Sequence, residues 1–211
     1  LGHHQHVKTG GIDSKFGLAL VDLPAFVRLA GKVGARIDVL HAHVGSGVTD
    51  KAHWANLFAQ LAGQADAIGT VKAINLGGGL GVPYGDDDEV FDIDALADAL
   101  QESRQQFPEY AVWMEPGRFM VAEAGVLLTH VSQVVDKLGL RRIGLDAGMN
   151  ALMRPALYQS KHRIVNLNRL SEANDRRVDV VGPICESTDV LARAVYLPEA
   201  TAENDVILID T

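Results

Sequence analysis

The hydrophobic positions of residues 22–118 follow two alternating periods. Three segments repeat apolar side chains every three or four residues, which predicts helices: one capped by Asp22 and stopped at Gly34, one from Thr49 or Asp50 to Ile68, and one over residues 93–107. Short apolar runs at residues 36–44, 71–76 and 111–114 predict the strands between them. This order is typical of a parallel α/β sheet or barrel.

The pattern changes after about Val121. From there the apolar positions form short β-branched runs with no long helix between them, at residues 126–135, 142–146, 162–166, 178–181 and 205–209. We therefore predict two domains. Residues 1–121 would be part of a (β/α)8 barrel of the TIM type, its C-terminal part, and residues 122–211 part of a mostly antiparallel β-domain.

The amino-acid composition limits the kinds of molecule that this chain is expected to bind. The net charge of -8 and the pI near 5.4 argue against a nucleic-acid or anionic-membrane surface, which would need concentrated Lys and Arg. The single cysteine, Cys185, fits a reducing compartment, so we expect a cytoplasmic protein acting on small molecules. The uncapped start at Leu1 and the terminal strand at 206–209 also predict an interior fragment of a longer chain.

The ends of the three predicted barrel strands carry chemically distinctive residues. His43 could stack on a flat ring, Ser46 and the glycines Gly78 and Gly79 could hold a phosphate, and Glu115 could pair with a ring nitrogen. In a barrel all three ends face one mouth. Pyridoxal 5'-phosphate (PLP) needs this combination, because a carboxylate at its pyridine nitrogen keeps the ring electron-accepting.

Each feature alone also has an ordinary explanation. A glycine-rich turn is usually only a turn, and His43 at the end of an apolar strand would usually be a hydrogen-bonded structural residue. His3, His4 and His6 could suggest a metal, but a loop or tag-like tract explains them better, and no metal site is predicted.

The ordered motifs together resemble the diaminopimelate decarboxylases, which belong to the alanine-racemase-like, fold-type III group of PLP enzymes. The resemblance rests on His43-Val44-Gly45-Ser46, residues 76–81 (LGGGLG), Glu115-Pro116-Gly117-Arg118, residues 146–150 (DAGMN), residues 154–158 (RPALY) and residues 182–187 (GPICES). The start, HHxHVxTGG over residues 3–11, also resembles the branch that is fused to an aspartate kinase.

The resemblance implies a role for each matching residue. Cofactor-binding residues would be His43, Ser46, Gly78, Gly79, Glu115, Gly117 and Arg118. Arg118, Arg154 and Tyr158 would bind the distal carboxylate of diaminopimelate, and Glu186 its distal ammonium. Cys185 would be the catalytic acid that protonates the carbanion after carbon dioxide leaves, and it would come from the neighbouring subunit of a homodimer. The implied reaction is decarboxylation of meso-diaminopimelate to L-lysine.

One part of the family pattern is missing. The family's Schiff-base lysine would precede residue 1, a later active-site tyrosine would follow residue 211, and none of the seven lysines replaces the first. Lys72 lies at the wrong end of its strand and Lys15 in a loop, so we expect this chain alone to be inactive. Two alternatives remain open: a decarboxylase of another basic amino acid, and a non-catalytic relative that acts by binding a partner.

Overall fold

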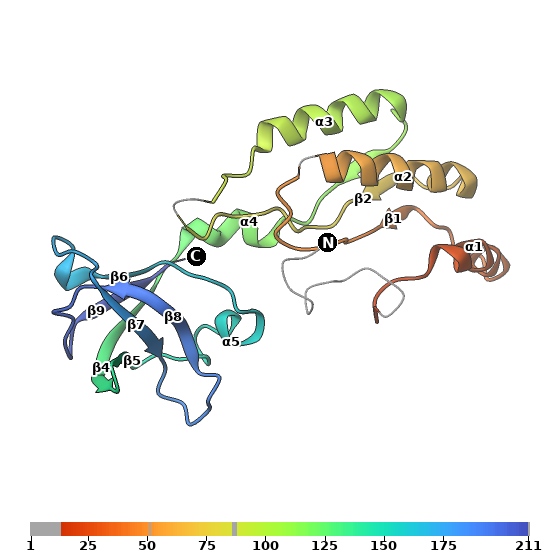
Figure 1. The fold of residues 1–211 in the computed structure, drawn as a ribbon. Helices are drawn as coiled ribbons and strands as arrows, with labels where there is room; N and C mark the ends of the chain where they lie inside the picture. The colour runs from red at the N-terminus through yellow and green to blue at the C-terminus, as the bar shows by residue number, and fades with distance from the viewer. Residues whose placement is uncertain (1–13, 51, 86–87, 211) are drawn as a thin grey trace. The chain divides into compact units, whose positions relative to one another are not determined.

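The computed structural model describes residues 14–50, 52–85 and 88–210 (Figure 1). These residues form two compact units, each with its own apolar core. Unit 1 contains the described residues up to Val82 together with Glu89–Val121, and unit 2 contains Pro83–Asp88 and the residues from Ala122 onward. His3, His4 and His6, and the start that resembles the kinase-fused branch, lie outside the described residues.

Unit 1 is built on a three-stranded parallel sheet with the order β1-β2-β3. The strands are short: β1 (Val39–His41), β2 (Ala73–Asn75) and β3 (Ala111–Trp113). The helices around them are η2 (Leu20–Asp22), α1 (Leu23–Lys32), α2 (Ala52–Ile68), α3 (Ile93–Gln106), α4 (Gly117–Val121) and, at the start of unit 2, η3 (Ala122–Ala124). The alternation of helix and parallel strand that the sequence predicts is therefore present, although the strand predicted at 36–44 is ordered as a ladder over three residues only.

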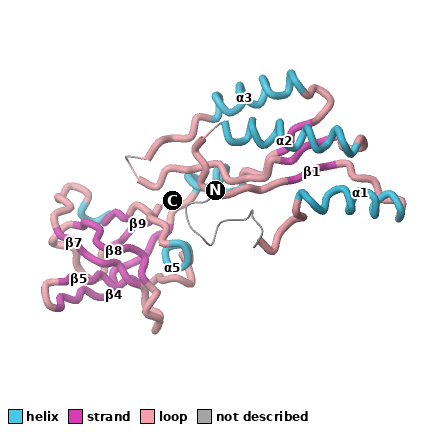
Figure 2. Tube along the Cα trace, turned by 45° about the vertical axis from the view of Figure 1, so that its right-hand side comes forward, coloured by secondary structure: helices cyan, strands magenta, loops and turns pink. Residues whose placement is uncertain are grey.

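Helices α2 and α3 lie side by side (Figures 1 and 2). The apolar positions that predicted α2 face the core, where Trp54 and Phe58 are almost completely buried. In α3, Leu96 is buried and Leu100 packs against the same core, whereas Ala97 is exposed. Trp113 on β3 is half exposed, in contrast to Trp54.

Helix α1 begins where the sequence predicts, but not for the predicted reason. Asp22 occupies the N-cap position, yet its side chain makes no capping hydrogen bond, because the residue closes the preceding turn η2 and has a helical backbone. Gly34 follows the helix with a φ of 72°, which agrees with its role as the stop. The apolar side chains Phe26 and Leu29 remain about half exposed.

Unit 2 is a six-stranded sheet with the order β6-β9-β4-β5-β7-β8, in which β5–β7 is the one parallel pair. Its strands are β4 (Leu127–Lys137), β5 (Leu140–Leu145), β6 (Ile164–Asn166), β7 (Arg176–Val181), β8 (Val190–Leu197) and β9 (Val206–Ile209). The short helices α5 (Arg154–Tyr158) and η4 (Leu167–Arg169) lie between strands. Figure 2 shows the sheet strongly curved, and the prediction of a mostly antiparallel sheet is confirmed.

Strand β8 was missed by the sequence analysis. Its centre, Ala192-Arg193-Ala194, has no β-branched residue, and Ala194 adopts a left-handed φ of 56° at an irregular part of the pairing with β7. The irregularity interrupts the alternation of buried and exposed side chains that would have revealed a strand. Among the helices that the structure describes, none is long and apolar enough to cross a membrane.

Candidate active site

The loops that follow β1, β2 and β3 remain hydrogen-bonded to one another beyond the strands. The Glu115 N–H donates to the Gly77 carbonyl over 2.8 Å, and the Val48 N–H donates to the Gly79 carbonyl over 2.9 Å. Because parallel strands end at the same edge of a sheet, these contacts gather the three loops at one place.

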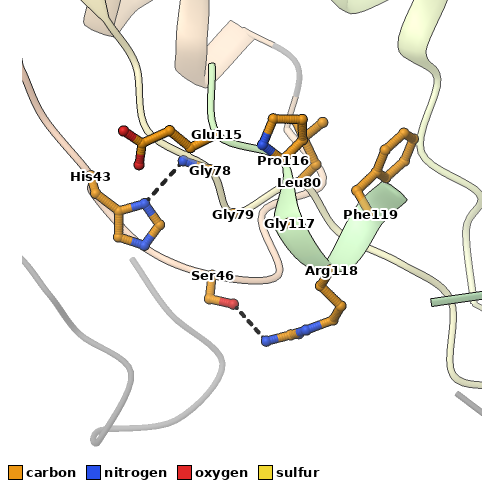
Figure 3. A pocket seen from close by; sticks show the side chains of 10 residues that line it. All are labelled: His43, Ser46, Gly78, Gly79, Leu80, Glu115, Pro116, Gly117, Arg118 and Phe119. Atoms are coloured by element: carbon orange, nitrogen blue, oxygen red, sulfur yellow. Dashed lines mark hydrogen bonds between the residues drawn. The ribbon is translucent and has the colours of Figure 1, made fainter. Parts of the chain in front are cut away.

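The three loops enclose a pocket of about 320 Å³ within unit 1 (Figure 3). Its walls are His43, Ser46, Gly78, Gly79, Leu80, Glu115, Pro116, Gly117, Arg118 and Phe119. All seven residues that we predicted to bind the cofactor are in this set, so the structure brings together residues that lie up to 75 positions apart in the sequence (118 − 43). The volume is in the range of small-molecule sites, roughly 300–1,000 Å³.

Two glycines allow the loops to approach this closely. A Cβ atom at Gly78 would lie 2.2 Å from the Glu115 carbonyl oxygen, and one at Gly79 would lie 2.1 Å from the Gly45 carbonyl oxygen. Gly79 also has a φ of 98°, which other residues rarely adopt. Only glycine fits at both positions without moving backbone.

The polar side chains of the pocket are held by specific contacts. Nδ1 of His43 accepts the Gly78 N–H over 3.2 Å, so the neutral ring carries its hydrogen on Nε2. The Ser46 hydroxyl oxygen accepts a hydrogen bond from Nη2 of Arg118 over 3.1 Å. In Figure 3 the His43 ring and the Glu115 carboxylate lie near each other, while Ser46 and Arg118 point toward one another at a different part of the pocket.

Glu115 has two partners that the sequence analysis did not identify. Nδ2 of Asn75 donates to Oε1 of Glu115 over 2.8 Å, and Nε2 of His41 lies 3.6 Å from Oε2. Asn75 and His41 are the last residues of β2 and β1 and stand opposite each other in the register. The sequence feature that could have indicated Asn75 is its position as a polar residue at the end of an apolar strand, next to a run of glycines.

None of the lysines that the structure describes lines this pocket. Lys72 immediately precedes β2, at the end of the strand away from the glycine loop, and Lys15 precedes η2.

Arg154 and Tyr158 lie together on α5 in unit 2. The Arg154 guanidinium stacks over the Tyr84 ring, with its carbon 4.9 Å from the ring centre, and its Nη1 lies 3.4 Å from Nε2 of His162. Nδ1 of His162 faces the Asp210 carbonyl at 2.8 Å and must donate to it, which leaves Nε2 of the neutral ring as an acceptor for Arg154. Nη2 of Arg154 is buried and has no hydrogen-bond partner in the described part of the chain.

Cys185 and Glu186 lie on the loop between β7 and β8, and both are exposed. The Thr188 N–H and the Ser187 hydroxyl donate to Glu186 and lower the pKa of its carboxyl group below the ordinary value, so Glu186 is ionised at neutral pH. A negative charge at this position suits an ammonium group.

The loop has an anchor that the sequence analysis missed. The buried Asp189 carboxylate accepts the Ile184 N–H over 2.8 Å and the Met149 N–H over 2.6 Å. It thereby joins two of the recognised motifs, residues 146–150 and 182–187, and a Cβ at either Gly148 or Gly182 would collide with it. The loop that carries Cys185 and Glu186 is thus anchored by one buried carboxylate.

Comparison with known proteins identifies the group to which these features correspond. The family described as pyridoxal-dependent decarboxylase, C-terminal sheet domain, matches residues 18–211. Diaminopimelate decarboxylase of Methanothermobacter thermautotrophicus is 38% identical over 99% of this chain and 51% of its own length, and that of Escherichia coli K12 is 37% identical over 100% and 54%. A crystal structure of Helicobacter pylori diaminopimelate decarboxylase complexed with L-lysine gives a TM-score of 0.85 at 31% identity, covering 98% of this chain and 52% of that one. The chain spans about half the length of the relatives it matches.

Proposed function

Because this chain belongs to the family of pyridoxal-dependent decarboxylases, we propose that the whole protein removes the carboxyl group of meso-diaminopimelate and releases L-lysine and carbon dioxide with PLP as cofactor. One observation carries the proposal: the seven predicted cofactor residues, which come from the ends of three successive parallel strands, line a single pocket of about 320 Å³. The two diaminopimelate decarboxylases named above, at 37% and 38% identity, support the choice of substrate.

The pocket has the right groups for a phosphorylated pyridine. A guanidinium and a hydroxyl, from Arg118 and Ser46, lie at one part of the pocket, near Gly79, where a side chain would collide with backbone. A carboxylate, Glu115, and an imidazole, His43, lie at another. The guanidinium and the hydroxyl would bind the phosphate dianion, the imidazole would lie against the flat ring, and the carboxylate would pair with the protonated ring nitrogen.

In this proposal the residues of the pocket hold different parts of the cofactor. Ser46, Arg118 and the loop at Gly78, Gly79 and Gly117 hold the phosphate, His43 lies against the ring, and Glu115 keeps a proton on the ring nitrogen. When bound, PLP supplies an electron-accepting ring for the pair released at the substrate's α-carbon. The Schiff-base lysine of the full protein would come from outside the residues that line this pocket.

The substrate residues are assigned by charge. Arg154 offers a buried N–H group that has no partner among the described residues, which suits the distal carboxylate, and Tyr158 lies one helical turn away. Arg118 would also contact this carboxylate. The ionised Glu186 suits the distal ammonium, and Cys185 next to it would deliver the proton to the α-carbon. An exposed Cys185 fits a residue that serves the site of a second subunit, and we propose a homodimer with shared active sites.

The architecture in this proposal is a barrel followed by a β-domain. Residues 1–121 would form part of a PLP-binding (β/α)8 barrel, its C-terminal part, and residues 122–211 part of the β-domain; the parallel strands of unit 1 and the curved sheet of unit 2 support this division. The protein would act in the cytoplasm, since diaminopimelate and lysine are small soluble metabolites.

The test is lysine formation from meso-diaminopimelate by the full-length gene product, with and without added PLP. We expect PLP-dependent lysine release. An Arg154→Leu variant should raise KM by about tenfold or more, because one charge-assisted contact to the distal carboxylate is lost. An enzyme that decarboxylates ornithine, arginine or lysine instead would replace the substrate assignment, and a PLP-free, inactive product would favour a non-catalytic partner-binding protein.

A further inference from the structure

Asn75, the last residue of β2, is hydrogen-bonded on both sides of its side-chain amide. Nδ2 donates to the Glu115 carboxylate over 2.8 Å, and Oδ1 accepts the Gly77 N–H over 2.9 Å. Both partners have a fixed polarity, because a backbone N–H can only donate and an ionised carboxylate can only accept. The orientation of the amide is therefore determined by its surroundings.

The same amide connects two parts of the pocket. Gly77, with a φ of 67°, begins the glycine loop, and the next residue, Gly78, donates its N–H to His43. Glu115 stands at the end of the neighbouring strand β3. Asn75 thus links the carboxylate, the glycine loop and, through Gly78, the imidazole.

We propose that Asn75 is a positioning residue for the cofactor, which directs the Glu115 carboxylate at the ring nitrogen while it fixes the first turn of the glycine loop. The inference rests on the proposed function, because it assigns Asn75 to the task given there to Glu115. In this inference Asn75 couples the position of the Glu115 carboxylate to the position of the glycine loop.

The inference gives the amide at position 75 a specific task. An aspartate could accept from Gly77 but would place a second carboxylate about 3 Å from Glu115, and two such groups cannot both be ionised, so they would share a proton. A leucine could make neither hydrogen bond. Other charged or titratable groups also face Glu115, namely His41 on β1, and His43 and Arg118 line the same pocket.

The experiment measures PLP binding by the full-length gene product from the absorbance of the bound cofactor, without substrate, between about pH 6 and pH 9. Asn75→Leu should weaken binding by about tenfold or more across this range, the loss expected for a hydrogen bond to a charged group. Asn75→Asp should weaken binding most at high pH and recover toward low pH, as the shared proton is taken up. Asn56, exposed on α2, provides the matched controls Asn56→Leu and Asn56→Asp, which should bind as wild type.

A double variant separates positioning from folding. Asn75→Asp combined with Glu115→Gln exchanges donor and acceptor, so the hydrogen bond between the two side chains is restored while the negative charge moves from position 115 to position 75. Thermal stability should return toward wild type, but PLP affinity should stay low. Recovery of both would mean that Asn75 is only structural.

The outcomes distinguish this inference from the proposed function. Wild-type-like PLP binding by both Asn75 variants, or equal losses without pH dependence, overturns the inference alone. A wild-type protein that binds PLP but forms no lysine overturns the proposed reaction and leaves the inference to be decided by the binding data. A wild-type protein that does not bind PLP overturns both.

Discussion

At the scale of single residues, Gly78 is tightly constrained, because the space a side chain would need is taken by the backbone of another loop. Its Cβ would lie 2.2 Å from the Glu115 carbonyl oxygen, and that carbonyl belongs to the loop that carries the carboxylate. Backbone cannot rotate away as a flexible side chain could, so a substitution must move one loop against the other.

Gly78→Ala should therefore destabilise the protein by about 1–3 kcal/mol, the usual cost of overpacking. Gly63 is the matched control: it lies exposed within α2, a Cβ there would meet nothing within 4 Å, and Gly63→Ala should stabilise the helix by roughly 1 kcal/mol. Urea unfolding followed by circular dichroism measures both. If Gly78→Ala is as stable as wild type, the loops are looser than this packing implies.

The residues that could be recognised from the sequence are those whose type is unusual beside their neighbours, such as Ser46, Glu115 and the glycine run at 77–79. Their gathering at one pocket followed from the alternation of helices and parallel strands. The contacts of Asn75 and Asp189 could not be found in this way, since each residue also has a partner 40 positions away in the sequence. Their roles are defined only by the tertiary structure.

At the scale of secondary-structure elements, the helices were predicted better than the strands. A helix carries its own hydrogen bonds and shows its buried face every three or four residues, so α1, α2 and α3 begin and end close to the predicted positions. A strand depends on its neighbours, and β1 is paired over three residues because β2 offers three partners. In β8 the irregular pairing interrupts the alternation of buried and exposed side chains by which a strand is recognised in a sequence.

The N-cap residues of α1 and α3 allow a direct test of how much a capping hydrogen bond stabilises a helix. Oδ1 of Asp92 accepts the Ala95 N–H over 2.9 Å at the start of α3, whereas Asp22 makes no such bond at the start of α1. Asp92→Ala should cost about 1 kcal/mol in the free energy of unfolding, and Asp22→Ala clearly less. Denaturant titration of the two variants decides it, and equal losses would show that charge at the helix start, rather than the hydrogen bond, stabilises α3.

At the scale of the whole molecule, one buried carboxyl group makes the stability of unit 2 depend on pH. Unit 2 contains a buried polar group, Asp205, which burial would push toward the neutral form. The hydrogen bonds from Arg169, Asn166 and the Ala202 N–H outweigh this effect and lower the pKa of Asp205 below its ordinary value. Its stabilising contribution is therefore complete above about pH 4 and is lost as the pH falls through the lowered pKa.

Asp205→Asn should consequently destabilise unit 2 by about 2 kcal/mol at neutral pH, the value of a hydrogen bond to a charged group, and the difference from wild type should shrink below pH 4. Amide hydrogen exchange in β9 measures this unit specifically. The exposed Glu203, two positions away, gives the control Glu203→Gln, which should exchange as wild type. A difference that stays constant down to pH 2 would contradict the assignment to the ionised carboxylate.

The placement of the two tryptophans makes tryptophan fluorescence a probe of unit 1 alone. Trp54, enclosed in its core, and Trp113, partly in contact with solvent two positions before Glu115, both belong to unit 1, and the sequence contains no other tryptophan. Tryptophan emission therefore follows the surroundings of the pocket and says nothing about the curved sheet. Any melting curve recorded by tryptophan fluorescence alone describes unit 1, so unfolding of unit 2, which carries Cys185 and Arg154, would pass unseen.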